Sequence, residues 1–170
     1  MTAKARRAEL LRRVADHILT HGLDASSLRP LAKAAGTSDR MLLYYFCDKA
    51  DLITAALDVI AARLTTILET RTSKTPRPLD ELRPALIKII LAEDLWPYMR
   101  LWLEIASLAA KGDAFYQALG NQIARGFLAW GAAQLDSKDP ATDAAKLLVS
   151  IEGTLLLKSV GLDDVIAQAG

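Results

Sequence analysis

The chain has 170 residues, of which 52% are hydrophobic and 24% charged, so it is long enough to bury a core and has the composition of a folded protein. Its one cysteine, Cys47, excludes an internal disulfide framework and a cysteine-based zinc site, and favours a reducing compartment. No apolar run of about 18 residues is present and the N-terminus lacks the apolar centre of a signal peptide, so we expect a cytoplasmic protein without a membrane partner.

The net charge of +1 is unevenly divided along the sequence. Residues 1–49 hold nine Lys and Arg side chains against five Asp and Glu, a local charge of +4, whereas the rest of the chain carries −3. A basic N-terminal third favours a polyanionic partner. Charged helix faces are often only solvated, so the charge by itself leaves both interpretations open.

The first two predicted elements are helices. Apolar residues recur at helical spacing over residues 3–21, and Gly22 follows where a left-handed C-cap is expected. A second helix begins after Ser26 or Ser27, either of which can cap it, and ends at Gly36.

The remaining predicted elements are also helices, separated by glycine, proline and short polar segments. A short third helix is expected over residues 38–45, and a fourth has Asp48 as its N-cap and ends near residue 70, before the polar linker RTSKTPRPLD. Later helices are expected at about 79–94, 97–111, 113–136 and 140–160, with a last short turn in LDDVIAQ. The sequence therefore predicts an all-α fold.

The segment AAGTS joins the second and third predicted helices by a tight glycine turn, as a helix-turn-helix requires. Loose matches to this pattern are common in helical proteins. Lys49 adds a more specific signal, because a cation at a helix N-terminus costs about 0.3–1 kcal/mol unless an anion binds beside it. Ser26 or Ser27 offers a hydroxyl to a second phosphate at the start of the second helix.

Six short motifs carry a resemblance at consistent spacing: Gly22, Ser26-Ser27, Leu31-Ala32, Gly36-Thr37-Ser38, Tyr44-Tyr45-Phe46 and Lys49. Because of these motifs, the segment from about residue 5 to residue 55 resembles the DNA-binding domain of the TetR family of bacterial transcriptional regulators. Leu43 and Tyr45 depart from the most common family pattern, which has tyrosine and histidine at these positions. The resemblance implies a helix-turn-helix domain over residues 1–48, a connecting helix at about 48–70, and a helical regulatory and dimerisation domain over 71–170.

The resemblance also implies how the third helix works. It would enter the major groove, where Arg40 can pair with a guanine edge and Met41 can meet a thymine methyl. Tyr44 and Tyr45 would reach phosphates, unless Met41 and the tyrosines pack on the first helix instead. The implied DNA-binding residues are Ser26, Ser27, Arg29, Thr37, Ser38, Asp39, Arg40, Met41, Tyr44, Tyr45 and Lys49.

In the family, the C-terminal part encloses a pocket for a small-molecule effector. The candidate ligand-binding residues here are Trp96, Met99, Trp102, Glu104, Phe115 and Phe127. Aromatic residues at helical spacing form core more often than they bind ligands. Glu104 and Glu152 lie in apolar runs and can orient a ligand, or pair with a basic residue such as Arg100, Arg125 or Lys158.

The resemblance further implies a homodimer through helices of about 113–136 and 140–160. These helices carry more apolar residues than two neighbours are expected to cover, and small residues between them permit close packing. The apolar set is Ile123, Phe127, Trp130, Leu135, Leu147, Leu148, Ile151, Leu155 and Leu156.

The sequence contains little that favours catalysis. His17 and His21 lie one helical turn apart and can share a metal, but a surface pair is favoured because no further ligand has suitable spacing. We therefore predict no catalytic residues, cofactor or metal. The predicted function is a ligand-responsive repressor that binds a palindromic double-stranded DNA operator as a homodimer, and the alternative is an all-helical dimeric ligand-binding module without DNA-binding activity.

Overall fold

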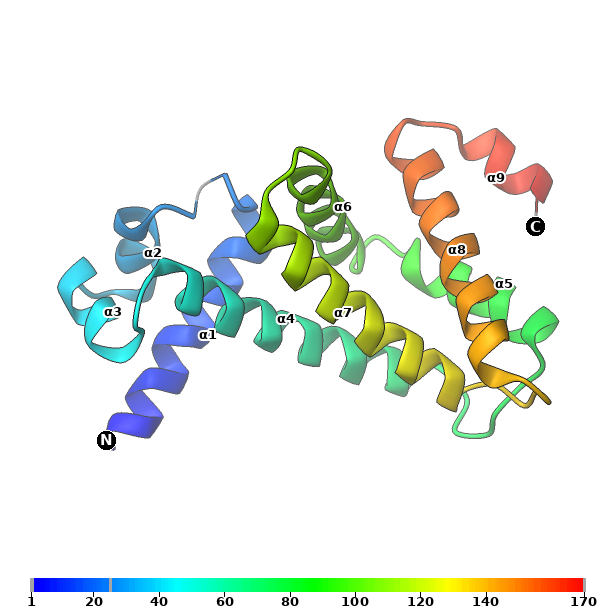
Figure 1. Ribbon diagram of the computed structural model, residues 1–170, viewed down its shortest axis with the longest axis horizontal. Helices are drawn as coiled ribbons and strands as arrows, with labels where there is room; N and C mark the ends of the chain where they lie inside the picture. Colours follow the sequence, from blue (N-terminus) through cyan, green and yellow to red (C-terminus); the bar gives the residue numbers. More distant parts are fainter. Residues whose placement is uncertain (1, 25, 170) are drawn as a thin grey trace.

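The computed structural model describes residues 2–24 and 26–169 and confirms the all-α fold (Figure 1). Over these residues the regular secondary structure consists of nine helices and no strand, with one isolated backbone bridge between Arg77 and Leu135. None of the helices in this part of the chain is long and apolar enough to cross a membrane. The helices are α1 (Ala3–His21), α2 (Leu28–Ala35), α3 (Asp39–Tyr45), α4 (Lys49–Arg71), α5 (Leu79–Ile90), α6 (Trp96–Ala110), α7 (Ala114–Ala133), α8 (Pro140–Ser159) and α9 (Asp163–Ala169).

The long helix α4 connects the two ends of the molecule (Figure 1). Helices α1, α2 and α3 lie at one end, and α5, α8 and α9 lie at the other. Helices α6 and α7 pack against each other in the middle, and α6 also contacts α1 while α7 contacts α4 and α8. This arrangement makes α6 a direct bridge between the N-terminal helices and the C-terminal half of the chain.

The helix boundaries follow the expected positions at the N-terminal end and depart from them further along. Helix α1 spans the expected residues, and the predicted Asp48 cap of α4 accepts a hydrogen bond from the Asp51 N–H at 2.8 Å. Helix α5 ends at Ile90 rather than near 94, where the Ala92 N–H turns back to the Ile89 carbonyl at 3.1 Å. Helix α7 ends at Ala133 rather than 136, and the last predicted turn is a helix of its own, α9.

Two of the four described glycines with positive φ, Gly22 and Gly36, end the first two helices. Gly36 ends α2 in the left-handed region, with φ 68° and ψ 40°, and so permits the tight turn into α3. Gly22 ends α1 with φ 80° as expected for a glycine, but its ψ of −175° is extended and not left-handed helical. The chain therefore leaves α1 in an extended direction rather than in a left-handed cap.

Three clusters of buried hydrophobic residues hold the helices together. The largest joins α1, α2, α3 and α4 and also includes Leu101 and Ile105 of α6 and Leu119 of α7. The second cluster is formed by Leu64, Leu68, Ile90, Leu95, Met99 and Leu155, and the third by Leu82, Leu86, Leu135, Ala144 and Leu147. The N-terminal helices thus share a continuous core with the middle of the molecule.

The apolar residues expected to remain free for a partner on α7 and α8 are mostly used within the chain, which corrects that prediction. Leu135, Leu147 and Leu155 are buried, and Phe127, Trp130 and Ile151 pack against the same clusters. These side chains point inward because α5 and α6 cover them. The largest exposed apolar side chains of α8 and the turn after it are Val149 at 73%, Leu156 at 58% and Val160 at 63%.

Candidate DNA-binding interface and apolar cavity

Helix α3 is anchored on one side and open on the other. Leu42 and the following Phe46 are buried in the largest core cluster. On the open side, Arg40 is exposed, Met41 is 42% exposed and Tyr44 is 74% exposed. Large exposed apolar and aromatic side chains on one short helix at the tip of a molecule are typical of a binding surface.

The two adjacent tyrosines have different environments. Tyr45 is half-buried and packs against the core cluster, and its ring meets that of Tyr44 edge to face with 5.0 Å between centroids. The Arg7 side chain of α1 donates to the Tyr45 carbonyl at 3.4 Å and lies over the Phe46 ring at 4.5 Å. Tyr45 therefore packs against the rest of the protein, as the alternative prediction had it, whereas Tyr44 remains available to a partner.

Two of the five Lys and Arg side chains of α1 form ion pairs within the protein. Arg12 and Arg13 both pair with Glu9, at 3.0 and 2.7 Å, and their hydrogen bonds lower the pKa of Glu9 to about 2. Arg12 also pairs with Asp16, which in turn binds Arg63 of α4 at 2.7 Å. These arginines stabilise the contact between α1 and α4 and are engaged before any ligand arrives.

The basic residues of α2, α3 and the start of α4 are not neutralised in this way. On these helices, four exposed cations have side chains without an ion pair or hydrogen bond to any described residue, namely Arg29, Lys33, Arg40 and Lys49. They lie on the helices that surround the open side of α3. The positive charge at this end of the molecule is therefore free to meet an anion.

The helix caps distinguish Ser27 from the other candidates. Ser38 caps α3 by accepting from the Met41 N–H at 3.3 Å, whereas Ser27 is exposed at the start of α2 and makes no side-chain capping bond. Ser26 is only 1% exposed, so its hydroxyl is not accessible to a phosphate, contrary to the prediction. Of the remaining candidates, Arg29, Ser38, Asp39 and Lys49 are exposed and Thr37 is half-buried.

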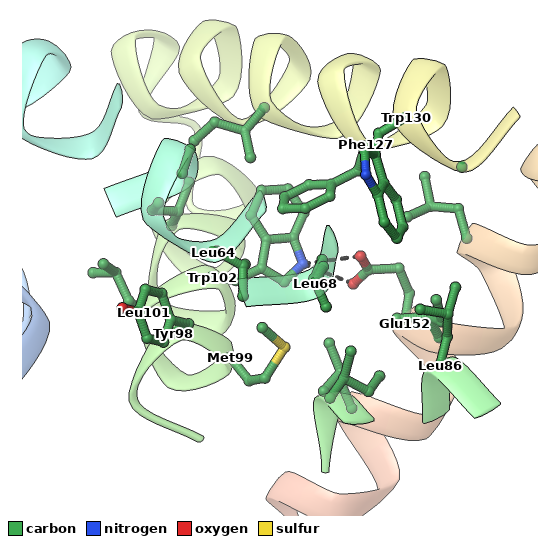
Figure 2. A pocket seen from close by; sticks show the side chains of 18 of the residues that line it. Leu64, Leu68, Leu86, Tyr98, Met99, Leu101, Trp102, Phe127, Trp130 and Glu152 are labelled. Atoms are coloured by element: carbon green, nitrogen blue, oxygen red, sulfur yellow. Dashed lines mark hydrogen bonds between the residues drawn. The ribbon is translucent and has the colours of Figure 1, made fainter. Parts of the chain in front are cut away.

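An apolar cavity of about 110 Å³ lies between α4, α5, α6, α7 and α8 and is partly open to solvent (Figure 2). Met99, Trp102 and Phe127, three of the predicted ligand-binding residues, line it. Trp96 and Phe115 pack against core clusters outside the lining, and Glu104 also lies elsewhere. Trp130 lines the cavity too, and its buried Nε1 has no hydrogen-bond partner in the described structure.

Glu152 of α8 supplies a carboxylate to the cavity wall. Both of its oxygens accept from Trp102 Nε1 of α6, at 2.8 and 3.0 Å, so this contact crosses from one helix to the other (Figure 2). Burial raises the pKa of Glu152, and the Trp102 hydrogen bond partly opposes that shift. The expected basic partners bind elsewhere: Arg100 to the Thr20 carbonyl, Arg125 to Asn121 and Lys158 to Asp163.

Glu104 of α6 binds the end of α1 instead of a ligand, which corrects its predicted role. Its carboxylate accepts from the Leu23 N–H with both oxygens at 2.9 Å and from the Asp24 N–H at 3.1 Å. The φ of 80° at Gly22 favours glycine, and a Cβ there would lie 2.7 Å from Glu104 Oε2, so a larger residue would also have to displace this carboxylate. Leu23 and Glu104 are 81 residues apart, so no local sequence pattern indicated this contact.

Helix α6 therefore contacts both functional regions. Trp102 faces the cavity, while Glu104 and Arg100 bind the backbone at the end of α1, Arg100 through the Thr20 carbonyl at 3.1 Å. The three residues lie within two turns of one helix, which moves as a rigid element. One helix therefore links the cavity wall to the end of α1.

The histidine pair does not form part of a metal centre in the described residues. The rings of His17 and His21 stack with 4.3 Å between centroids. No group of three or more His, Cys, Asp or Glu side chains with metal-binding geometry occurs within residues 2–24 and 26–169.

Comparison with known proteins identifies the N-terminal segment. Residues 12–56 match the sequence model of "Bacterial regulatory proteins, tetR family". No match was found among curated protein sequences. The matched segment contains α2 and α3 together with the beginning of α4 and most of α1.

Solved structures extend the likeness to most of the chain. A protein from Rhodococcus sp. described as a TetR-family transcriptional regulator is 21% identical, with a TM-score of 0.69 over 91% of this chain and 87% of that one. A transcriptional regulator from Streptomyces coelicolor A3(2), SCO7518, is 20% identical, with a TM-score of 0.64 over 88% and 98%. One from Pseudomonas aeruginosa PAO1 is 15% identical, with a TM-score of 0.67 over 95% and 82%. Residues 12–56 thus carry the sequence pattern of the TetR family of bacterial regulatory proteins, and the chain as a whole shares the fold of these solved regulators.

Proposed function

We propose that the protein is a repressor that binds a palindromic operator as a homodimer and is released from it by a small molecule bound in the apolar cavity. The observation that carries the proposal is the open side of α3, where Arg40, Met41 and Tyr44 are exposed and Arg40 has no partner in the described structure. A short exposed helix with an unpaired arginine suits the reading of base edges in the major groove.

Contacts to the DNA backbone are proposed to flank this helix. Lys49 at the first position of α4, Ser27 at the start of α2 and Tyr44 offer a cation and hydroxyl groups to phosphates. Backbone contacts fix the position of a protein on DNA, and base contacts give sequence preference. We therefore assign base reading to Arg40 and Met41, and positioning to Ser27, Tyr44 and Lys49.

The proposed dimer uses the exposed stripes of α7 and α8. Along α8, Val149, Gly153, Leu156 and Val160 recur at helical spacing and are all exposed. On α7, the exposed residues at such spacing are small or polar: Ala118, Gln122, Gly126, Ala129 and Ala133. A two-fold four-helix contact would cover both stripes and present two α3 helices to half-sites about 34–36 Å apart.

The ligand response is proposed to act through α6. A ligand that favours one placement of Trp102 would shift α6, and with it the Glu104 and Arg100 contacts to the end of α1. A ligand changes DNA affinity only by its differential affinity for the two placements. This coupling supports a response to a small molecule in a protein whose cavity and α3 lie far apart in the fold.

Selection of bound duplexes from a random pool, followed by gel shifts at increasing salt, tests the function. We expect enrichment of a two-fold symmetric sequence and an affinity that falls with salt as phosphate contacts are lost. Absence of any DNA binding by a folded dimer would overturn the proposal and favour a ligand-binding module without DNA-binding activity.

Lys49→Ala is expected to weaken binding to the selected sequence and to random duplex by similar factors, because a phosphate contact carries no sequence information. The slope of log affinity against log salt should fall by about one unit. Gel shifts over a salt series measure both quantities. Lys74→Ala removes the same charge from the exposed α4–α5 linker and should leave both unchanged.

Arg40→Ala is expected to cost about 1–3 kcal/mol at one operator base pair in each half-site and to relax the preference there. Competition among duplexes with each base substituted in turn measures this loss. An equal loss of affinity for every sequence would show that Arg40 contacts phosphate and that α3 does not read bases through it. Arg83→Ala on the exposed face of α5 is the matched control.

A further inference from the structure

The cavity between α4 and α8 has an uneven distribution of charge. Among the described residues that line it, Glu152 alone carries a carboxyl group, and no Lys, Arg or His side chain is present. Tyr98 is the other titratable group of the lining. When Glu152 is ionised, the lining therefore offers no oppositely charged side chain to it.

The Glu152 carboxylate also has unused hydrogen-bonding capacity. A carboxylate accepts about four hydrogen bonds, and the only donor that the described structure provides is the Trp102 Nε1. An ionised acceptor in an apolar wall is costly until a donor or a cation reaches it. This residue is thus the most favourable contact that the cavity offers to a polar ligand.

Aromatic rings surround the space in front of the carboxylate. Trp102 and Phe127 lie on one side of it and Trp130 lies nearby, while Met99 lies below, as seen in Figure 2. Aromatic faces attract cations, by about 0.5–2 kcal/mol for each contact. A carboxylate among aromatic rings selects a positively charged group over a neutral or negative one.

We propose that the cavity binds an organic ammonium cation with a small apolar body, and that the ammonium group contacts Glu152. This inference rests on the proposed function, since it names the ligand class of the same regulatory site. The cavity of about 110 Å³ is somewhat smaller than the engineered cavity of about 150 Å³ that takes up benzene. It therefore admits one small ring or branched alkyl group, and a longer body extends through the open side.

Binding of the cation would affect the N-terminal helices through helix α6. An ammonium group that donates to Glu152 draws the carboxylate away from Trp102 and loosens the contact between α8 and α6. Helix α6 carries Glu104, which holds the end of α1. The contacts of Glu152 with Trp102 and of Glu104 with the end of α1 would thus connect cation binding in the cavity to the N-terminal helices.

Titration of the full-length protein without DNA tests the ligand class with three probes of one shape: benzylammonium, benzyl alcohol and benzoate. Tryptophan fluorescence and calorimetry measure binding, since Trp102 and Trp130 both line the cavity. We expect one benzylammonium per chain with at least tenfold tighter binding than benzyl alcohol, and no binding of benzoate. Equal binding of the alcohol or of benzoate, or no binding of benzylammonium at millimolar concentration, would overturn the proposal.

Two matched variants locate the contact. Glu152→Gln keeps the shape and an oxygen that can accept from Trp102, and it should weaken benzylammonium binding at least tenfold without changing that of benzyl alcohol. Glu69→Gln removes the same charge from the exposed face of α4 and should change neither. If Glu152→Gln does not fold by circular dichroism, the three-probe comparison on the unchanged protein decides alone.

These measurements separate the ligand class from the proposed function because no DNA is present. Selective benzylammonium binding that depends on Glu152 supports the ligand class even if the protein binds no DNA. If an anionic or neutral compound bound in the cavity as tightly as benzylammonium and released the protein from DNA, the proposed ligand class would be wrong. The repressor function would still stand.

Discussion

Gly153→Arg is expected to convert the proposed homodimer into a monomer and to abolish the proposed operator binding. Gly153 lies in the exposed stripe of α8 between Val149 and Leu156, and an added Cβ would meet no atom within 4 Å in the protomer. Arginine therefore fits the isolated chain, and it is a better helix former than glycine by about 0.5–1 kcal/mol. In a two-fold contact the same substitution would place a long cation from each chain against the other.

Loss of the dimer should reduce operator affinity by a factor on the order of 10²–10⁴, because the second half-site is then no longer bound at high effective concentration. Sedimentation velocity at micromolar concentration and gel shifts measure the two effects, and circular dichroism should show unchanged helix content. Ala62→Arg, at an exposed position of α4, is the control and should remain dimeric. A dimer unaffected by Gly153→Arg, or an unsubstituted protein that is monomeric at this concentration, would refute the placement of the interface.

Glu104→Ala is expected to lower the free energy of unfolding by about 2 kcal/mol, because charge-assisted hydrogen bonds to the Leu23 and Asp24 N–H groups are lost and the buried Leu23 is left without an acceptor. Urea denaturation of the full chain measures this change. Glu104→Gln retains an acceptor oxygen and should lose less. Glu93→Ala, at an exposed position between α5 and α6, should lose almost nothing.

Glu104→Ala also tests whether α6 couples ligand binding in the cavity to DNA binding. If α6 transmits ligand binding, the ratio of operator affinities with and without ligand should move toward one in Glu104→Ala, while ligand affinity in the absence of DNA stays nearly the same. Gly22→Ala should act in the same direction, since its Cβ would approach Glu104 Oε2 to 2.7 Å and its φ of 80° strains any other residue. An undiminished ligand effect in both variants would exclude this route.

The local features of the N-terminal helices could be predicted because they depend on neighbours in sequence. The turn at Gly36, the Asp48 cap and the limits of α1 each follow from residues within a few positions. The likeness to TetR-type domains rests on the same short-range spacings. The inward placement of Leu42 and Phe46 also follows from helical periodicity.

The sequence could not show which of two adjacent residues of the same type is exposed in the folded protein. Ser26 and Ser27 are identical in type and adjacent, yet only Ser27 is accessible, because Ser26 is buried in the folded chain. Tyr44 and Tyr45 differ for a similar reason, since α1 reaches Tyr45 through Arg7. Which of two neighbours faces solvent depends on the packing of elements that the local sequence does not encode.

The amino-acid sequence by itself determined the all-α fold, the positions of most helices and the helix-turn-helix likeness, because hydrophobic periodicity and caps act within one or two turns. Tertiary structure alone decided the roles of Glu104 and Glu152, whose partners lie 81 and 50 residues away. It also decided that Phe127, Trp130 and Ile151 face a cavity while Val149, Leu156 and Val160 stay exposed. The physical reason is that a buried carboxylate or an apolar helix face is stabilised by whichever group the packed helices bring to it, and sequence distance does not limit that choice.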